Sequence, residues 1–148
     1  MQKARLIAHI ASTLREKAIN VERDIASTLE ARNSDTKSSA GDKHEVGRAM
    51  IQQELDQQEA QLAKLRVLLR EMERVPVERR YERVGAGALV STDKGIFFLA
   101  IGLGRIELDG AACAVVSVAS PAGQALVGKR VGETTTLNGA TYRVLAID

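Results

Sequence analysis

The sequence predicts an α+β protein, with an N-terminal antiparallel coiled-coil helical hairpin followed by a small antiparallel β domain with one short helix. Two observations predict this class. Apolar residues recur three and four positions apart through the first half of the chain, which is typical of amphipathic helices. After Val84 short β-branched runs punctuated by Gly and Asp replace that pattern, which is typical of strands and turns. We therefore expect a hairpin over residues 1–75, a charged linker over 76–84 and a β domain over 85–148.

The first helix is predicted from one apolar stripe that starts a few residues into the chain. Its members recur at steps of three and four: Ile7, Ile10, Leu14, Ala18, Val21, Ile25 and Leu29. A helix with a single apolar stripe has to bury that stripe against a partner. The simplest partner is the next helix along the chain.

The second helix carries a more regular stripe. Its members alternate steps of four and three: Ile51, Leu55, Gln58, Leu62, Leu65, Leu69 and Met72. This is a coiled-coil seam in which Gln58 is the one polar member. Between the two stripes, residues 33–41 are rich in the residue types that favour turns and helix caps. Two arms of about 30 residues around a short loop predict an antiparallel hairpin with its tip at about residues 33–45.

The linker begins where Pro76 ends the second helix, because proline cannot continue a helix and biases the residue before it toward extended geometry. Four arginines gather in this region: Arg74, Arg79, Arg80 and Arg83. Two interpretations stay open. The arginines pair with the glutamates between them as solvated charges, or they contact an anionic partner.

The β domain is predicted from four apolar runs, over residues 88–92, 95–101, 112–118 and 141–147. Hairpin turns are expected at 92–95 and, more strongly, at Asn138-Gly139. One short helix should interrupt the strands. Ser120 is a good N-cap, Pro121 fits the first helical position and Gly128 follows as a stop signal.

Composition narrows the class of function. The chain of 148 residues is 45% apolar but only 3% aromatic, which suits helix seams and small sheets better than ring-lined ligand pockets. The formal net charge of +2 does not indicate nucleic-acid binding by bulk charge. Cys113 is the one cysteine, so a disulfide within the chain is excluded. No signal peptide, membrane span or independent enzyme site is apparent. We expect a cytoplasmic protein with no membrane partner and no small-molecule substrate.

Residues 116–133 resemble the C-terminal domain of the Gre transcript-cleavage factors, bacterial proteins that bind RNA polymerase. That family carries a strand, a Ser-Ser-Pro-type cap, a short Ala-Leu helix, then Gly-Lys and Gly-Asp/Glu before the next strand. The matching positions are Val118, Ser120, Pro121, Ala125, Leu126, Gly128, Lys129, Gly132 and Glu133. At the predicted tip, residues 41–45 (Gly-Asp-Lys-His-Glu) are similar to the family's Gly-Asp-x-x-Glu. The order of helix, tip, helix, linker and β domain is also that of the family.

The resemblance implies an FK506-binding-protein-like β domain and a role as a transcription elongation factor that is not itself an enzyme. The β domain would dock at the rim of the secondary channel of RNA polymerase while the hairpin enters that channel. The residues that we expect to bind the partner are Ser120, Pro121, Lys129, Arg79 and Arg80. The 3′ end of the nascent RNA is a second expected contact.

For the tip, the resemblance implies that Asp42 and Glu45 assist the polymerase in cleaving backtracked transcripts. Two metal ions stabilise the attacking and leaving oxygens in such a hydrolysis. Asp42 would help to hold the second Mg²⁺, and Glu45 would orient the water. The Mg²⁺ would be shared with the polymerase, and we expect no cofactor bound to the chain alone. His44 lies between the two carboxylates and has no partner for proton transfer apparent in the sequence.

Other interpretations of the tip stay open. Asp42 and Glu45 also have the spacing of a near capping box, in which each satisfies backbone N–H groups at the helix start. Val46 stands where the family usually has Asn, and Ala49 where an aromatic residue is expected. A regulator that occupies the channel without stimulating cleavage is therefore an alternative. A coiled-coil scaffolding protein, for which the acidic tip would be dispensable, is another.

A prolyl isomerase is the rival suggested by the implied fold. Its site would need an aromatic-lined apolar pocket. The β domain offers Phe97, Phe98 and Tyr142, and the two Phe are adjacent, so they should point to opposite faces of a strand. Fold alone does not confer that activity.

Overall fold

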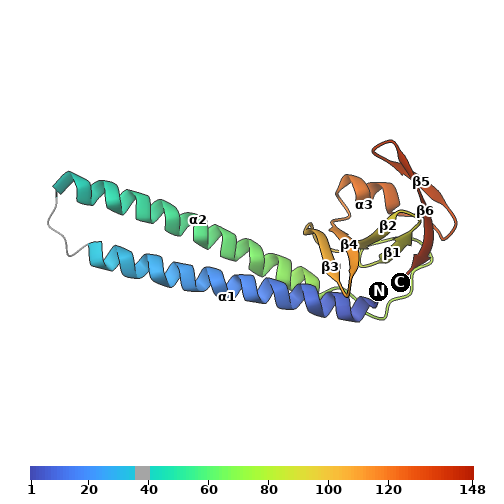
Figure 1. Ribbon diagram of the computed structural model, residues 1–148, viewed down its shortest axis with the longest axis horizontal. Coiled ribbons are helices and arrows are strands. Elements are labelled where there is room, and N and C mark those ends of the chain that lie inside the picture. The colour runs from blue at the N-terminus through green and yellow to red at the C-terminus, as the bar shows by residue number, and fades with distance from the viewer. Residues whose placement is uncertain (36–40) are drawn as a thin grey trace. The chain divides into compact units, whose positions relative to one another are not determined.

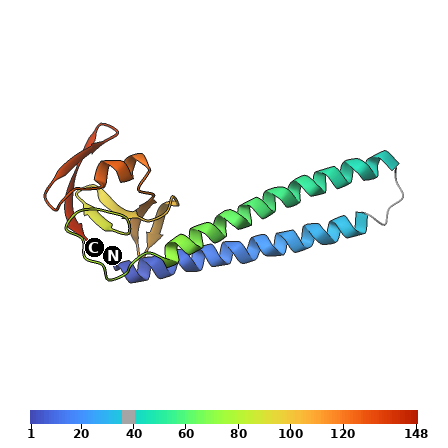
Figure 2. The same ribbon diagram turned by 180° about the vertical axis from the view of Figure 1, so that it is seen from behind.

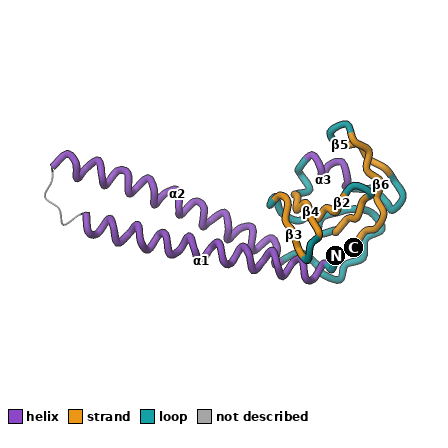
Figure 3. Tube along the Cα trace, viewed as in Figure 1, coloured by secondary structure: helices purple, strands orange, loops and turns teal. Residues whose placement is uncertain are grey.

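The structure, a computed structural model, describes the backbone of residues 1–35 and 41–148, and the side chains of all of these except 35 and 41–44. The elements in chain order are α1 (Lys3–Asp35), α2 (Gly41–Glu73), β1 (Leu89–Thr92), β2 (Gly95–Leu99), β3 (Gly104–Leu108), β4 (Ala111–Val116), α3 (Pro121–Leu126), β5 (Thr134–Leu137) and β6 (Ala140–Ile147). They form two compact units. The hairpin unit is Ser12–Arg70, and the β unit combines Met1–Ala11 with Glu71–Asp148. The strands all belong to the β unit (Figure 3).

The hairpin unit is built by α1 and α2, which run side by side in opposite directions (Figures 1 and 2). Each helix is 33 residues long, so the prediction of two equal arms is confirmed. The side chains buried in this unit include members of both predicted stripes: Leu14, Val21, Leu55, Leu62 and Leu65. An ion pair between Arg66 Nη2 and Glu22 Oε1, at 3.2 Å, joins the helices outside the seam.

Burial in the seam decreases toward the loop end of the hairpin. Leu55 is 2% exposed, whereas Ile51, one turn nearer the loop, is only half-buried. Ile25 and Leu29 are half-buried on α1. Met50 is 67% exposed, so the first turns of α2 contribute little apolar area to the hairpin.

The β unit contains a six-stranded sheet in the order β3-β4-β2-β1-β6-β5. Both predicted hairpin turns are confirmed, since Thr92 pairs with Gly95 and Leu137 with Ala140. Asn138 and Gly139 have φ values of 50° and 77°, as a type I′ turn requires. This turn matches the right-handed twist of the strands on either side.

One strand pairing differs from the predicted antiparallel sheet. β2 pairs with β4 in parallel, Ile96 opposite Cys113, while the other four pairings are antiparallel. The parallel pairing arises because of β3, a strand that the apolar runs did not indicate. β3 and β4 form an antiparallel hairpin, and β4 lies between β3 and β2. The architecture of two long helices, a sheet and one short helix is as predicted, but the sheet is mixed.

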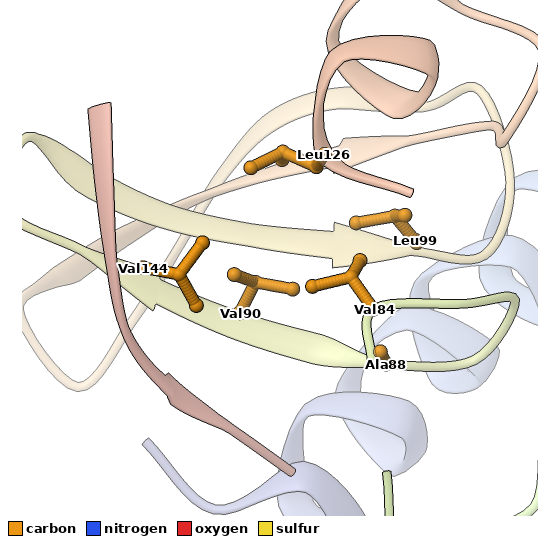
Figure 4. Close-up of a cluster of buried hydrophobic side chains, with 6 residues drawn as sticks. All are labelled: Val84, Ala88, Val90, Leu99, Leu126 and Val144. Atoms are coloured by element: carbon orange, nitrogen blue, oxygen red, sulfur yellow. The ribbon is translucent and has the colours of Figure 1, made fainter. Parts of the chain in front are cut away.

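Helix α3 covers one face of the sheet and completes the core of the β unit. Figure 4 shows the six side chains of this core converging from the strands, from α3 and from the segment before β1. They are Val84, Ala88, Val90, Leu99, Leu126 and Val144, each at most 2% exposed. Full burial of a leucine such as Leu126 contributes roughly 1.5–3 kcal/mol. α3 is therefore fixed to the sheet by apolar packing.

The opposite face of the sheet is buried as well. Phe98 and Val115 have no exposed surface, and Cys113 is 1% exposed. The first turns of α1 belong to this unit, and Arg5 Nη2 lies 2.9 Å from Asp109 Oδ1 at the turn between β3 and β4. The beginning of α1 is therefore held against the β unit. The predicted domain boundaries at 75 and 85 follow chain order and stay a prediction.

Candidate functional site

The first candidate region is the loop end of the hairpin, where α2 begins at Gly41. The backbone places Asp42 and Glu45 three positions apart in the first turns of α2, a spacing that puts two residues on a similar side of a helix. Glu45 is exposed. The side chains of Asp42 and His44, and residues 36–40 of the predicted tip loop, lie outside the described residues. Whether the two carboxylates converge on one ion therefore stays a prediction.

The two positions that depart from the family pattern are both on the surface. Val46 is 60% exposed, and Ala49 is exposed too. Neither side chain is needed for the hairpin seam. Together with Met50 they form an exposed apolar strip beside Glu45, and this strip is available for contact with a partner.

The second candidate region is α3 with its two ends. Ser120 caps the helix: its Oγ accepts a hydrogen bond from Gly123 N at 3.0 Å and donates one to the Ser117 carbonyl oxygen at 2.6 Å. Pro121 is the exposed first residue of the helix. The sequence prediction of this cap and helix is confirmed. A Cβ on Gly123 would lie 2.2 Å from the Ser117 carbonyl oxygen, so this corner admits no side chain there.

Backbone hydrogen bonds fix the far end of α3. Val84 N donates to the Lys129 carbonyl oxygen at 2.8 Å, and Gly128 N donates to the Val84 carbonyl oxygen at 2.8 Å. Thr135 Oγ1 donates to the Ala125 carbonyl oxygen at 2.7 Å and so joins α3 to β5. The Ser120–Pro121 corner and the half-exposed Lys129 are therefore presented on a rigid support.

The third candidate region is a pocket of about 690 Å³ beside the linker, which we call the Tyr81 pocket. Its walls include Lys3, Arg79, Arg80, Tyr81, Ile147 and Asp148. Two of these are the predicted partner-binding arginines, and they lie apart in the chain from the α3 set. The Tyr81 hydroxyl donates to the Ala86 carbonyl oxygen at 2.8 Å. Burial raises the pKa of this hydroxyl, and the Arg79 charge opposes the rise.

Lys3 is the residue that the sequence did not indicate. Its side chain is buried, 7% exposed, and its Nζ lies 4.8 Å from the centre of the Tyr81 ring. The Arg79 guanidinium is 5.1 Å from the same ring. Burial lowers the pKa of Lys3; the Asp148 charge opposes this, and the Arg79 charge adds to it. One weak signal was present, an aromatic residue among arginines in the Arg79–Tyr81 segment.

The part of the chain with described side chains contains no group of three or more His, Cys, Asp or Glu placed to hold a metal ion. Burial raises the pKa of the Cys113 thiol to about 11, so this thiol is not a reactive nucleophile near neutral pH. Phe98 is fully buried, while Phe97 makes an edge-to-face contact with Tyr142, with ring centres 5.8 Å apart. The two adjacent Phe thus point to opposite faces, as predicted.

Over the residues that the structure describes, no helix is sufficiently long and apolar to pass through a bilayer.

No protein-family model matches the chain, and no curated protein matches it. Several solved structures do match the chain. GreA factor homolog 1 (Gfh1) of Thermus thermophilus is 22% identical over 93% of this chain and 94% of its own, with a TM-score of 0.38. Another structure, of the transcription factor Gfh1, is 21% identical over 93% and 92%, also with a TM-score of 0.38. Gfh1 of Thermus aquaticus is 23% identical over 88% and 94%, with a TM-score of 0.33. These values are too low to assign the chain to a family.

Proposed function

We propose that this protein is a Gre-type transcription elongation factor that binds RNA polymerase and places its hairpin tip in the secondary channel. The observation that carries the proposal is the likeness of two separate segments, residues 116–133 and 41–45, to the Gre factors. The capped helix α3, with Ser120, Pro121 and the Gly128-Lys129 step in the expected places, supports the match in the first segment. The start of α2 at Gly41 supports it in the second.

In this proposal the chain assists a reaction whose active site belongs to the polymerase. Mg²⁺ is usually held by one or two carboxylates together with waters and substrate phosphates. Asp42 would supply a carboxylate to the second Mg²⁺, and Glu45 would orient the attacking water. The Mg²⁺ ions, when bound, would supply stabilisation of the attacking and leaving oxygens at phosphorus. The hairpin contributes position, because α2 is a continuous helix from Gly41 to Glu73 and its seam is buried from Leu55 onward.

The proposal is tested with a stalled, backtracked RNA polymerase complex, Mg²⁺ and the full chain. We expect shortened transcripts. The informative variant is Asp42→Asn, because Asn caps a helix about as well as Asp but is a poor Mg²⁺ ligand. Its stability and polymerase binding should match the wild type while cleavage is lost. Full cleavage by Asp42→Asn would reject the metal role, and absence of polymerase binding by the wild type would reject the whole proposal.

A second function is favoured by Val46 and Ala49, the exposed residues that replace the family's Asn and aromatic residue. In that case the protein occupies the channel and regulates the polymerase without cleavage. Binding of the wild type without shortened transcripts would support this function. Restoring the family pattern with Val46→Asn and Ala49→Tyr should then create cleavage, with little effect on stability because both side chains are on the surface.

A further inference from the structure

The Tyr81 pocket brings together positive charges from distant parts of the chain. Lys3 comes from the start of α1, and Arg79 and Arg80 come from the linker. The Tyr81 ring lies within reach of both the Lys3 ammonium and the Arg79 guanidinium, and it attracts each through its negative π face. This arrangement concentrates cations at the wall of a pocket.

The charge of Lys3 is incompletely compensated. Its Nζ donates to the main-chain oxygen of Asp148 at 3.4 Å, which is a long hydrogen bond. Burial and the Arg79 charge both work against the protonated form, and the Asp148 charge only partly offsets them. A buried charge gains from an anion placed beside it, because the anion replaces the lost interaction with water. The pocket therefore favours a negatively charged group near Lys3 and Arg79.

The remaining walls indicate what kind of molecule carries that group. Val77, Ile147 and the Tyr81 ring supply apolar surface, whereas Glu78 and Asp148 supply carboxylates. A nucleic-acid backbone, with a charge on each phosphate, would meet these two carboxylates unfavourably. A peptide with one acidic side chain between apolar neighbours fits both the cations and the apolar walls. A volume of about 690 Å³ accommodates a few side chains.

We propose that the Tyr81 pocket binds a short acidic segment of a protein partner, with one carboxylate between Lys3 and Arg79 and apolar side chains against Val77 and Ile147. The site is separate from the hairpin tip. The binding of this segment does not depend on RNA polymerase being the partner. The pocket proposal can therefore fail while the proposed function holds, and the proposed function can fail while the pocket proposal holds.

The test uses the full chain, labelled with ¹⁵N, and a capped Leu-Asp-Leu-Asp-Leu peptide as the probe. Saturable amide shifts are expected at Lys3, Tyr81 and Ile147. A Leu-Asn-Leu-Asn-Leu peptide should bind at least about tenfold more weakly, because it keeps the shape and removes the charge. Absence of saturable binding at millimolar peptide, or equal binding of the two peptides, would overturn the proposal.

Variants identify the cations that bind the carboxylate. Arg79→Gln should weaken binding of the acidic peptide about tenfold. Arg83→Gln is the matched control, because Arg83 is an exposed arginine of the same segment that is not among the residues lining the pocket. Lys3→Met should also weaken binding; if it disturbs folding, the exposed Arg79 carries the test alone. Equal losses from Arg79→Gln and Arg83→Gln would reject the site. So would a five-nucleotide RNA that displaces the peptide at lower concentration, since the pocket would then prefer phosphates.

Discussion

The two compact units bury their apolar side chains in different ways. In the β unit both faces of the sheet are covered, and Val90, Phe98 and Val144 have no exposed surface. In the hairpin unit the described apolar side chains that are buried lie along one seam, and burial falls from Leu55 to the half-buried Ile51. The β unit is thus a closed core in which each side chain has neighbours on all sides. The hairpin is an open seam whose loop end depends on less apolar contact.

This difference matters for function. A closed core holds the Ser120 corner in a fixed position, as the proposed binding of a partner there requires. A graded seam leaves the first turns of α2 with exposed side chains such as Val46 and Met50, which are free to contact a partner. Substitutions in the two units should therefore have unequal effects, and the following predictions are ordered from the largest effect to the smallest.

Gly123→Ala should have the largest effect. Its Cβ would lie 2.2 Å from a backbone oxygen, and backbone cannot yield as a flexible side chain does. We expect a loss of about 3 kcal/mol or more in the free energy of unfolding of the β unit, measured by urea unfolding. Gly102→Ala is the control, because nothing lies within 4 Å of its added Cβ, and it should change stability by less than about 0.5 kcal/mol.

Leu126→Ala and Leu29→Ala compare the units directly with one chemical change. The first removes a side chain that is 1% exposed and leaves a cavity, so it should cost about 3 kcal/mol. The second removes a half-buried side chain near the loop end, where a loss of about 1 kcal/mol is expected. NMR peak intensities from each unit in urea would separate the two transitions. Equal losses in the free energy of unfolding would show that the loop end of the seam buries its side chains as fully as the core of the β unit does.

Gln58→Leu should raise the stability of the hairpin unit, whereas the substitutions above lower stability. The Gln58 Oε1 atom is buried without a hydrogen-bond partner, and its Nε2 only reaches Glu54 Oε1 at 3.4 Å. Replacing this amide by an apolar side chain in the seam should stabilise the hairpin by about 1 kcal/mol. Gln57→Leu, at an exposed position, should have almost no effect in the same urea experiment. A destabilised Gln58→Leu variant would mean that the amide has a partner in solution.

Lys3→Met should have the smallest effect on the free energy of unfolding. The effect appears only when stability is measured as a function of pH. Its pKa is lowered from 10.5 in the folded protein, chiefly by burial, so the unfolded chain binds its proton more tightly. Stability should therefore rise as the pH increases from the folded pKa toward 10.5. Lys3→Met should remove this rise when urea unfolding is repeated across that range. An unchanged slope in the variant would place Lys3 in contact with water.

Local signals made much of this fold predictable. The two stripes at helical spacing, the Ser120 cap and the Asn138-Gly139 turn each depend on neighbours within a few positions, and all three predictions are confirmed. Strand pairing depends on residues far apart in the chain. The parallel pairing of β2 with β4 and the presence of β3 were missed because β3 (Gly104–Leu108) has no fully buried residue and carries charged side chains between its apolar ones.

The candidate site was predictable to a lesser degree. The acidic tip and the α3 corner were indicated by short motifs. The Tyr81 pocket was not, because Lys3, Tyr81 and Asp148 meet only through tertiary packing. Arg79 and Arg80 were singled out for their charge alone, and charge does not reveal that Arg79 and a buried lysine both lie near one aromatic ring.

The pairing of β1 with β6 has a consequence for how the chain is made. Val90 lies opposite Ile147, and Leu89 and Asp148 exchange backbone hydrogen bonds of 2.8 Å, so the middle of the sheet is completed only by a strand from the far end of the domain. A ribosome releases α1 and α2 well before β6, and the local contacts of those helices can form at once. Until β6 emerges, one edge of β1 is unpaired and open to pairing with other chains. The nascent β domain therefore passes through an aggregation-prone interval that the nascent hairpin avoids.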